Sequence, residues 1–171
     1  VVSTVMANLG LDRSLEEAGI RMVKTPVGYR YVLEEMQRIG AVLGGEQSGH
    51  VIFLDHATTG DGIISALRLL AIMKETGEPL STLSRCLRKF PQVLVNVRVS
   101  AKPPVEEIPG LLGRVKEMEA SLDSRGRILV RYSGTEPLAR VMIEGEDRDT
   151  IETMARDLAQ IIASAIGLER G

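Results

Sequence analysis

The segment from Arg131 to Arg140 holds the side chains whose types and spacing best suit a chemical task. It reads Arg-Tyr-Ser-Gly-Thr-Glu-Pro-Leu-Ala-Arg, with strand-like apolar runs on both sides. Guanidinium groups bind phosphate oxygens in pairs, and the hydroxyls of Ser133 and Thr135 and the N–H groups around Gly134 can supply further donors. The segment is therefore a candidate phosphate-binding loop. The same residues also suit a surface hairpin with solvated arginines, and spacing alone leaves both interpretations open.

Three segments of the chain resemble the α-D-phosphohexomutase family. Residues 131–140 resemble the phosphate-binding loop near the C-terminus of these enzymes, and Gly-Gly-Glu-Gln-Ser-Gly-His at residues 44–50 resembles their sugar-recognition loop. Together with Val-Gly-Tyr-Arg-Tyr-Val at residues 27–32, these motifs are most similar to the bacterial members that act on glucosamine phosphates. The resemblance covers nearly the whole chain in the right order, but only the last two of the family's four domains.

The resemblance implies that residues 44–50 bind the sugar. Glycines such as Gly45 let the backbone turn tightly and approach a ligand. The Glu46 carboxylate can accept hydrogen bonds from two neighbouring sugar hydroxyls, and Ser48 can donate or accept another. Histidine is the side chain type that can change charge near neutral pH, so His50 could line the site or carry a proton, or could simply be a hydrogen-bonded residue beside a strand. Without the resemblance, the segment would also fit a plain strand-to-strand turn.

Four further residues near these motifs have weaker interpretations. Arg30 keeps the family's pattern and could contact sugar or phosphate, although a solvated arginine at a helix start fits equally well. Tyr29 stands where the family usually has Asp, which leaves the role of that acid open here. His56 has no motif around it and is expected at the surface. Asp61 has too few acidic neighbours to bind Mg²⁺ and is expected to cap a helix, so we expect no metal in this chain.

The family resemblance implies an activity that this chain could support only in part. Family members interconvert hexose 6-phosphates and 1-phosphates through a 1,6-bisphosphate intermediate, using a phosphorylated serine and Mg²⁺. Neither the phosphoserine motif (Thr-Ala-Ser-His-Asn-Pro) nor the metal motif (Asp-Gly-Asp-x-Asp-Arg) occurs in this sequence. We therefore expect the nucleophile and Mg²⁺ to belong to missing N-terminal domains, and this chain to bind glucosamine 6-phosphate and 1-phosphate without turning them over. The expected phosphate ligands are Arg131, Ser133, Gly134, Thr135 and Arg140, and the expected sugar ligands are Gly45, Glu46, Ser48, His50 and Arg30.

Three alternatives to a glucosamine-phosphate mutase remain open. The chain could be half of a phosphomannomutase or phosphoglucomutase, which competition among sugar phosphates would reveal. It could be a stand-alone sugar-phosphate-binding regulatory module, which should bind tightly by itself. It could also be a scaffold without a ligand, in which case Arg131→Ala would leave every binding signal unchanged.

The composition excludes several other classes. The chain has 171 residues, of which 44% are hydrophobic, enough for one domain or two small ones. A net charge of −2 without a basic patch, and only two Phe, three Tyr and no Trp, argue against nucleic-acid binding. The single Cys86 excludes an internal disulfide and is expected to be buried and inert.

The sequence also bears on location and assembly. No apolar run approaches the ~20 residues of a membrane span, and no signal peptide is visible, so we expect a cytoplasmic protein without membrane contact. Because residues 1–6 already read as a buried strand, an upstream part is expected to be missing. A homodimer is possible.

Hydrophobic periodicity divides the chain into two domains, 1–86 and 91–171, with the boundary at about 85–91. In the first, strands alternate with helices, which is typical of a layered α/β domain with a mainly parallel sheet. We expect Ser14 and Glu17 to form the capping box of its first helix. Its expected strands are 1–6, 20–24, 41–43 and 51–54, and its expected helices are 11–18, 31–39 (with Val32, Met36 and Ile39 inward) and 61–77.

The second domain is expected to be a smaller α+β domain with an antiparallel sheet. Valines at 93, 95, 97 and 99 alternate with other residues, as in a strand with one solvated face. We expect Asp149 and Glu152 to cap the last helix. The other expected elements are strands 127–130 and 141–144, a helix at 109–122 with Leu112, Val115, Met118 and Leu122 inward, and in the last helix a stripe of Ile151, Met154, Leu158, Ile161, Ile162 and Ala165.

Overall fold

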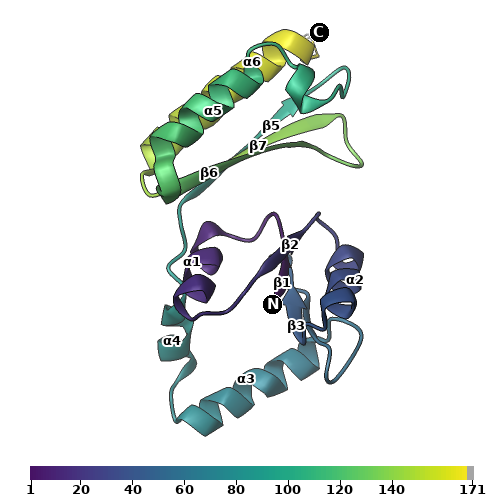
Figure 1. Cartoon of the computed structure of the whole chain (residues 1–171), viewed down its shortest axis with the longest axis vertical. Helices are drawn as coiled ribbons and strands as arrows, with labels where there is room; N and C mark the ends of the chain where they lie inside the picture. Colours follow the sequence, from purple (N-terminus) through teal and green to yellow (C-terminus); the bar gives the residue numbers. More distant parts are fainter. Residues whose placement is uncertain (169–171) are drawn as a thin grey trace. The chain divides into compact units, whose positions relative to one another are not determined.

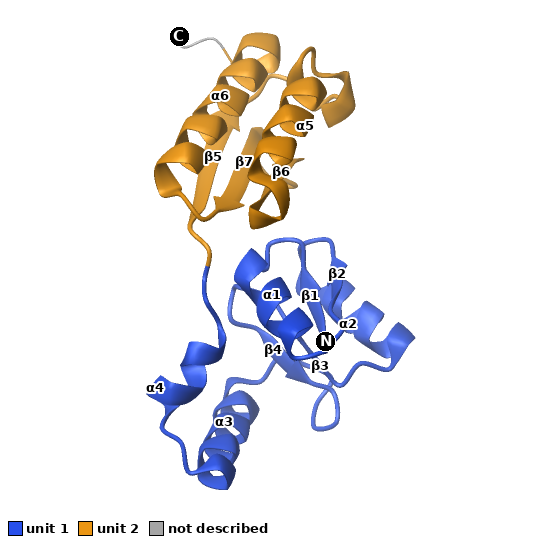
Figure 2. Cartoon of the chain, turned by 60° about the vertical axis from the view of Figure 1, so that its left-hand side comes forward, with its two compact units in different colours: residues 1–89 blue, residues 90–171 orange. Residues whose placement is uncertain are grey.

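The computed structural model describes residues 1–168 as two compact units. Unit 1 runs from Val1 to Lys89, and unit 2 begins at Phe90 (Figure 2). Each unit has its own sheet and its own apolar core. The last three residues of the expected second domain, 169–171, lie outside the described residues.

Unit 1 is a layered α/β unit (Figure 1). Its strands follow the spatial order β2-β1-β3-β4, in which β1 pairs in parallel with both β2 and β3, and β3 pairs antiparallel with β4. The prediction of a mainly parallel sheet is therefore confirmed. The elements are β1 (Val2–Thr4), α1 (Leu9–Glu17), β2 (Val23–Thr25), α2 (Tyr29–Ile39), β3 (Leu43–Gly45), β4 (Val51–Phe53), α3 (Gly62–Thr76), α4 (Leu80–Leu83) and a 3₁₀ turn at Ser84–Cys86.

The core of unit 1 forms where α2 packs on the sheet. Val32 and Met36 of α2 are buried as predicted, together with a strand residue on β1 and another on β4. A Cβ at Gly44 would overlap the Met36 sulfur, so glycine lets α2 approach β3 closely. Ile39 was also expected to face inward, but it is 41% exposed because it is the last residue of α2, one turn beyond this contact.

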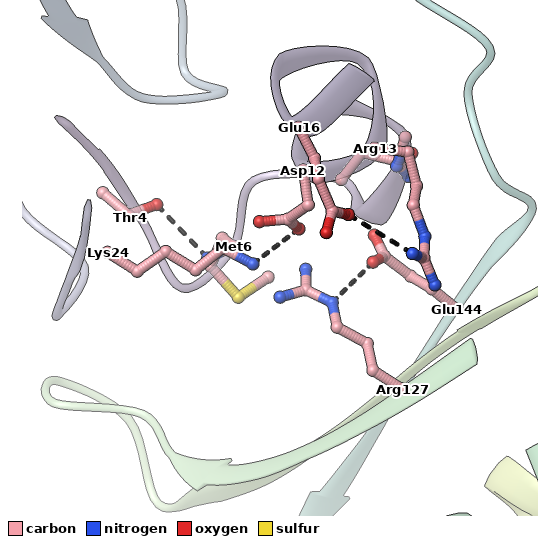
Figure 3. Close-up of polar contacts among 10 residues, drawn as sticks. Thr4, Met6, Asp12, Arg13, Glu16, Lys24, Arg127 and Glu144 are labelled. Carbon is pink, nitrogen blue, oxygen red and sulfur yellow. Dashed lines mark hydrogen bonds and ion pairs between the residues drawn. The ribbon is translucent and has the colours of Figure 1, made fainter. Parts of the chain in front are cut away.

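Helix caps in unit 1 agree only in part with the sequence patterns. The predicted capping box of Ser14 and Glu17 is wrong, because α1 begins earlier and its N-cap is Asn8, whose side chain accepts a hydrogen bond from Gly10 N at 3.0 Å. The Asp61 cap of α3 is confirmed by hydrogen bonds from two backbone N–H groups. Lys24 Nζ lies 2.6 Å from Asp12 Oδ2 and so ties β2 to α1 (Figure 3).

Unit 2 is an α+β unit with a three-stranded antiparallel sheet in the order β5-β7-β6, as predicted. Its two long helices lie together on one face of the sheet (Figures 1 and 2). The elements are β5 (Gln92–Arg98), a 3₁₀ helix at Val105–Glu107, α5 (Leu111–Leu122), a 3₁₀ turn at Asp123–Arg125, β6 (Gly126–Tyr132), β7 (Leu138–Gly145) and α6 (Arg148–Ile166).

The core of unit 2 differs from the prediction at the helix stripes. Leu111 is buried and Leu112 is 42% exposed, so the inward stripe of α5 starts one residue earlier than predicted. In α6, Ala155 is buried, whereas the predicted Ala165 is exposed near the end of the helix. The N-cap of α6 is Asp147, which accepts a hydrogen bond from Thr150 N at 2.7 Å, and not the predicted pair.

A buried ion pair also lies in this sheet. Glu144 of β7 is fully buried and pairs with Arg127, its cross-strand neighbour on β6, at 2.6 Å (Figure 3). Glu144 is the last residue of the predicted strand 141–144, and the sequence patterns gave no sign that its carboxylate would be buried.

Candidate functional site

The candidate phosphate loop is the hairpin that joins β6 to β7 in unit 2 (Figure 1). The structure extends both strands beyond their predicted ends, so Arg131 and Arg140 are strand residues at the mouth of the loop. They are direct cross-strand partners. Because directly paired residues project from the same face of an antiparallel sheet, both guanidinium groups start on one side of the hairpin. The loop itself is residues 133–137.

Ser133, which is buried, and Glu136, which is exposed, are hydrogen-bonded to each other within this loop. Ser133 is buried, and its N–H donates to Leu138 O at 2.8 Å, which closes the hairpin. Glu136 Oε2 accepts a hydrogen bond from Arg140 Nη2 at 2.7 Å and a longer one from Ser133 Oγ at 3.4 Å. Gly134 lies at the exposed tip. The structure thus brings Arg140 and Ser133 together around a carboxylate that the sequence did not single out.

The electrostatics of the loop favour an anionic ligand. Burial, together with the charge of Arg140, lowers the pKa of the Arg131 guanidinium below its ordinary value. Arg131 Nη1 donates to Tyr132 O at 3.4 Å. Arg140 Nε is buried and has no hydrogen-bond partner within residues 1–168. Two neighbouring guanidinium groups with donors left over can bind a phosphate group through charge-assisted hydrogen bonds.

Lys102 is a further residue at this loop that the sequence did not reveal. Its Nζ donates to Ser133 O at 2.6 Å. The preceding segment runs beside the loop, since Val99 N donates to Pro137 O at 3.0 Å. The sequence carries no signal for this contact, because the two residues are 31 positions apart and are brought together by the pairing of β5 with β7.

The candidate sugar loop lies in unit 1 and is shorter than predicted. Gly45 belongs to β3, so the turn proper starts at Glu46 and ends at His50. Glu46 N donates to His50 O, and Gly49 N donates to Glu46 O, each at 3.0 Å. A Cβ on Gly45 would lie 2.7 Å from His50 O, so a glycine is required for the two strands to approach this closely.

Three side chains of this turn converge on one another. Ser48 Oγ donates to Glu46 Oε1 at 2.8 Å and lies 2.9 Å from His50 Nδ1. His50 Nδ1 is also 3.2 Å from Glu46 Oε1. The Glu46 side chain is 13% exposed and that of His50 is 58% exposed. The carboxylate is therefore largely enclosed, and the imidazole is accessible to a ligand. Carboxylate, hydroxyl and imidazole together offer both acceptors and donors, which suits a ligand rich in hydroxyl groups.

Tyr29 supports this cluster from the start of α2. Its ring meets the His50 ring edge-on, with centroids 6.1 Å apart. Its hydroxyl donates to Thr58 O at 2.9 Å and accepts from Gly60 N at 3.1 Å. Tyr29 therefore connects the turn to residues 58–60. Arg30, by contrast, is 84% exposed at its side chain and pairs with Glu34 along α2.

The remaining candidates add no chemistry within the described residues. His56 is exposed. The prediction that Cys86 is buried is wrong, since it is an exposed thiol at the end of a 3₁₀ turn rather than part of a packed helix. Residues 1–168 contain no group of three or more His, Cys, Asp or Glu side chains that could hold a metal ion. No helix in the same range is long and apolar enough to cross a membrane.

The two units match two consecutive domains of one protein family. Residues 1–90 match the family described as phosphoglucomutase/phosphomannomutase, alpha/beta/alpha domain III. Residues 94–161 match phosphoglucomutase/phosphomannomutase, C-terminal domain.

Curated relatives agree with this assignment. The phosphoglucosamine mutases of Syntrophotalea carbinolica and Geotalea daltonii are each 54% identical to this chain over 98% of its length. The chain spans 37% of the length of each of these relatives.

Solved structures share the fold. The N-acetylphosphoglucosamine mutase of Aspergillus fumigatus, in complex with GlcNAc-6P and magnesium, superposes with a TM-score of 0.79 at 22% identity, over 96% of this chain and 38% of that one. A phosphoglucomutase/phosphomannomutase family protein of Burkholderia thailandensis superposes with a TM-score of 0.70 at 21% identity, over 98% and 39%. The chain belongs to the phosphoglucomutase/phosphomannomutase family, of which it comprises domain III and the C-terminal domain.

Proposed function

We propose that this chain is the sugar-phosphate-binding part of a phosphohexomutase that interconverts glucosamine 6-phosphate and glucosamine 1-phosphate. The observation that carries the proposal is the cross-strand pair of Arg131 and Arg140 at the mouth of a loop with a buried serine. The choice of an amino sugar is supported by the phosphoglucosamine mutases that are 54% identical to this chain.

The phosphate loop would hold the phosphate that is not reacting. Arg131 and Arg140 can each donate two hydrogen bonds to phosphate oxygens, and Ser133 Oγ can donate another. The N–H groups of Gly134 and Thr135, at the exposed tip, can complete the set. This work is positioning and charge neutralisation, which is the main protein contribution to phosphoryl transfer.

The turn of unit 1 would recognise the sugar ring. Glu46 can accept hydrogen bonds from two adjacent hydroxyls, and Ser48 and His50 can complete them as donors or acceptors. Because a sugar hydroxyl both donates and accepts, such a cluster can bind the ring in either of the two orientations that a bisphosphate intermediate must adopt. His50 is a candidate hydrogen-bonding ligand of the sugar.

The chemical step itself needs groups that this chain does not offer. Residues 1–168 contain no set of ligands that would fit Mg²⁺. The serine nucleophile and the Mg²⁺ site are proposed to lie in the part of the relatives that this chain does not span. This chain alone is then expected to bind sugar phosphate and to be inactive.

The proposal is tested by titrating the 171-residue chain with glucosamine 6-phosphate and following its amide resonances by NMR. A few charge-assisted hydrogen bonds of about 1.5–3 kcal/mol each, less the cost of ordering the ligand, suggest a Kd on the order of millimolar. Arg131→Ala should abolish saturable amide shifts at residues 133–136. Arg156→Ala, which removes an arginine that is 74% exposed on α6, is the matched control.

Each result of this titration separates the proposal from its alternatives. Undiminished binding by Arg131→Ala would reject the phosphate site. Micromolar binding by the unmodified chain would favour a self-sufficient regulatory module. Glucose 6-phosphate or mannose 6-phosphate competing better than glucosamine 6-phosphate would change the substrate but keep the mutase.

A further inference from the structure

Glu136 is the acidic residue of the phosphate loop, and it contacts two groups that the proposed function assigns to phosphate. Its Oε2 is 2.7 Å from Arg140 Nη2 and 3.4 Å from Ser133 Oγ, and both contacts are hydrogen bonds that it accepts. Its own N–H donates to Ser133 Oγ at 3.3 Å. The carboxylate therefore contacts the serine and the arginine at once, although the Glu136 side chain is 52% exposed.

A carboxylate oxygen and a phosphate oxygen accept hydrogen bonds from the same donors in this loop. Both are anionic acceptors of short, charge-assisted hydrogen bonds. The arginine and hydroxyl donors that contact Glu136 are therefore not fully available to an incoming phosphate. One N–H or O–H group cannot donate a full hydrogen bond to both anions, so phosphate has to displace the carboxylate or share its donors.

Other donors of the loop remain available. Arg140 Nε is buried and has no hydrogen-bond partner within the described residues. Arg131 has its contact at 3.4 Å with a backbone carbonyl, which is a neutral acceptor. Because Arg140 Nε is itself buried, Arg131 is the donor that can bind an incoming anion first, after which the anion competes with Glu136 for Arg140 and Ser133.

We infer that Glu136 is an internal competitor of phosphate, which holds Arg140 and Ser133 in place while the loop is empty and yields them when phosphate binds. The inference rests on the proposed function, since it needs phosphate to bind at this loop. It adds a residue that sets how tightly the phosphate is held.

Moderate phosphate affinity suits the proposed reaction. A bisphosphate intermediate has to release one phosphate from this loop and present the other before the second half-reaction. The Arg140 side chain is only 28% exposed, so a guanidinium left there without an acceptor would be costly. A carboxylate that returns to Arg140 when the phosphate leaves supplies that acceptor and so lowers the free-energy cost of release. Glu136 therefore lowers the affinity of the loop for phosphate and makes phosphate release faster.

Glu136→Gln tests the inference, because it removes the charge while keeping the size of the side chain and one acceptor oxygen. We expect this variant to bind inorganic phosphate about three- to tenfold more tightly than the unmodified chain, as removal of one like charge a few ångströms from a dianion suggests. The measurement is an NMR titration of the backbone amides of residues 133–136. Glu119→Gln, which makes the same charge change at an exposed position on α5, should leave the Kd unchanged.

A second readout follows the carboxylate itself. In the unmodified chain, saturating phosphate should shift the ¹³C resonance of the Glu136 carboxylate as it loses Arg140. Equal or weaker phosphate binding by Glu136→Gln would overturn the inference and make Glu136 a supporting residue of the loop. If the unmodified chain shows no phosphate-dependent shift at these amides, the proposed phosphate site fails, and the inference fails with it.

Discussion

At the scale of single residues, Lys102 fixes the first residue of the phosphate loop through one contact. The 2.6 Å hydrogen bond from its Nζ to Ser133 O places a positive charge next to the loop and holds the serine carbonyl. That charge attracts a phosphate dianion, and the exposure of Lys102 to solvent screens part of the attraction. Lys102→Met should therefore weaken phosphate binding about three- to tenfold.

The same phosphate titration measures this effect. Lys116→Met removes an exposed lysine from α5 and controls for the change in net charge. Equal Kd values for both variants would show that Lys102 has no special role at the loop.

Gly45 makes a second prediction at this scale, now in the sugar loop. An alanine Cβ there would lie 2.7 Å from His50 O, a backbone atom that can move only if the hairpin opens. Gly45→Ala should destabilise unit 1 by about 1–3 kcal/mol, the usual cost of overpacking. Urea denaturation followed by circular dichroism measures the loss.

Gly113→Ala is the matched control for this substitution. Gly113 lies in α5, and a Cβ there would meet nothing within 4 Å. Because alanine favours helix over glycine, this variant should be more stable by up to about 1 kcal/mol. If both alanines stabilised the chain, the close approach at Gly45 would not be a real constraint.

Single residues could be predicted from the sequence where a motif is contiguous. Glu46, Ser48 and His50 lie within five positions, and the structure does bring them together. Lys102 could not be predicted, because it reaches Ser133 only through the register of β5 on β7. Glu136 lay inside the motif, but its contact with Arg140 depends on how the hairpin closes.

At the scale of elements, periodicity predicted where helices and strands are but not how they begin. Alternation in Val93–Val99 predicted β5 almost to the residue. The capping residues of α1 and α6 were misplaced, because Asn8 and Asp147 precede the periodic stretch, and a better-matching capping-box pattern occurs inside each helix. Capping depends on the backbone conformation of the residue just before the helix. The spacing of hydrophobic residues carries no information about that conformation.

The cap of α6 gives a prediction on pH. Hydrogen bonds from the Thr150 side chain and backbone lower the pKa of the Asp147 carboxyl. Its folded pKa lies below the unfolded value of about 3.9, so its contribution to stability is present above that pH and is lost as the pH falls through the folded pKa. Thermal unfolding should therefore show a larger loss of Tm on acidification for the unmodified chain than for Asp147→Asn.

Asparagine is the appropriate replacement in this experiment, since it also caps helices but does not titrate. A loss of Tm on acidification that both proteins show is caused by other carboxylates. Parallel curves of Tm against pH for the two proteins would mean that Asp147 does not contribute to the acid sensitivity.

At the scale of the whole molecule, the chain divides into two units with cores of unequal size. The change from alternating strands and helices to an alternating valine strand near Phe90 predicts a domain boundary there, and unit 2 begins at Phe90. What the sequence could not show is how much each unit buries. The core of unit 1 has four buried apolar residues and that of unit 2 has twelve, among the described residues.

This inequality predicts the order in which the units unfold. Because burial of apolar surface is the main stabilising contribution, unit 1 should lose its NMR cross-peaks at a lower urea concentration than unit 2. Leu158→Ala, in the core of unit 2, should cost about 2–5 kcal/mol and lower the urea midpoint of unit 2 alone. Met36→Ala is the matched substitution in unit 1 and should lower the midpoint of that unit alone. Each core lies entirely within one unit. A single transition that both variants shift equally would therefore show that the two units unfold as one cooperative body. It would also show that the size of a unit's core does not set the stability of that unit.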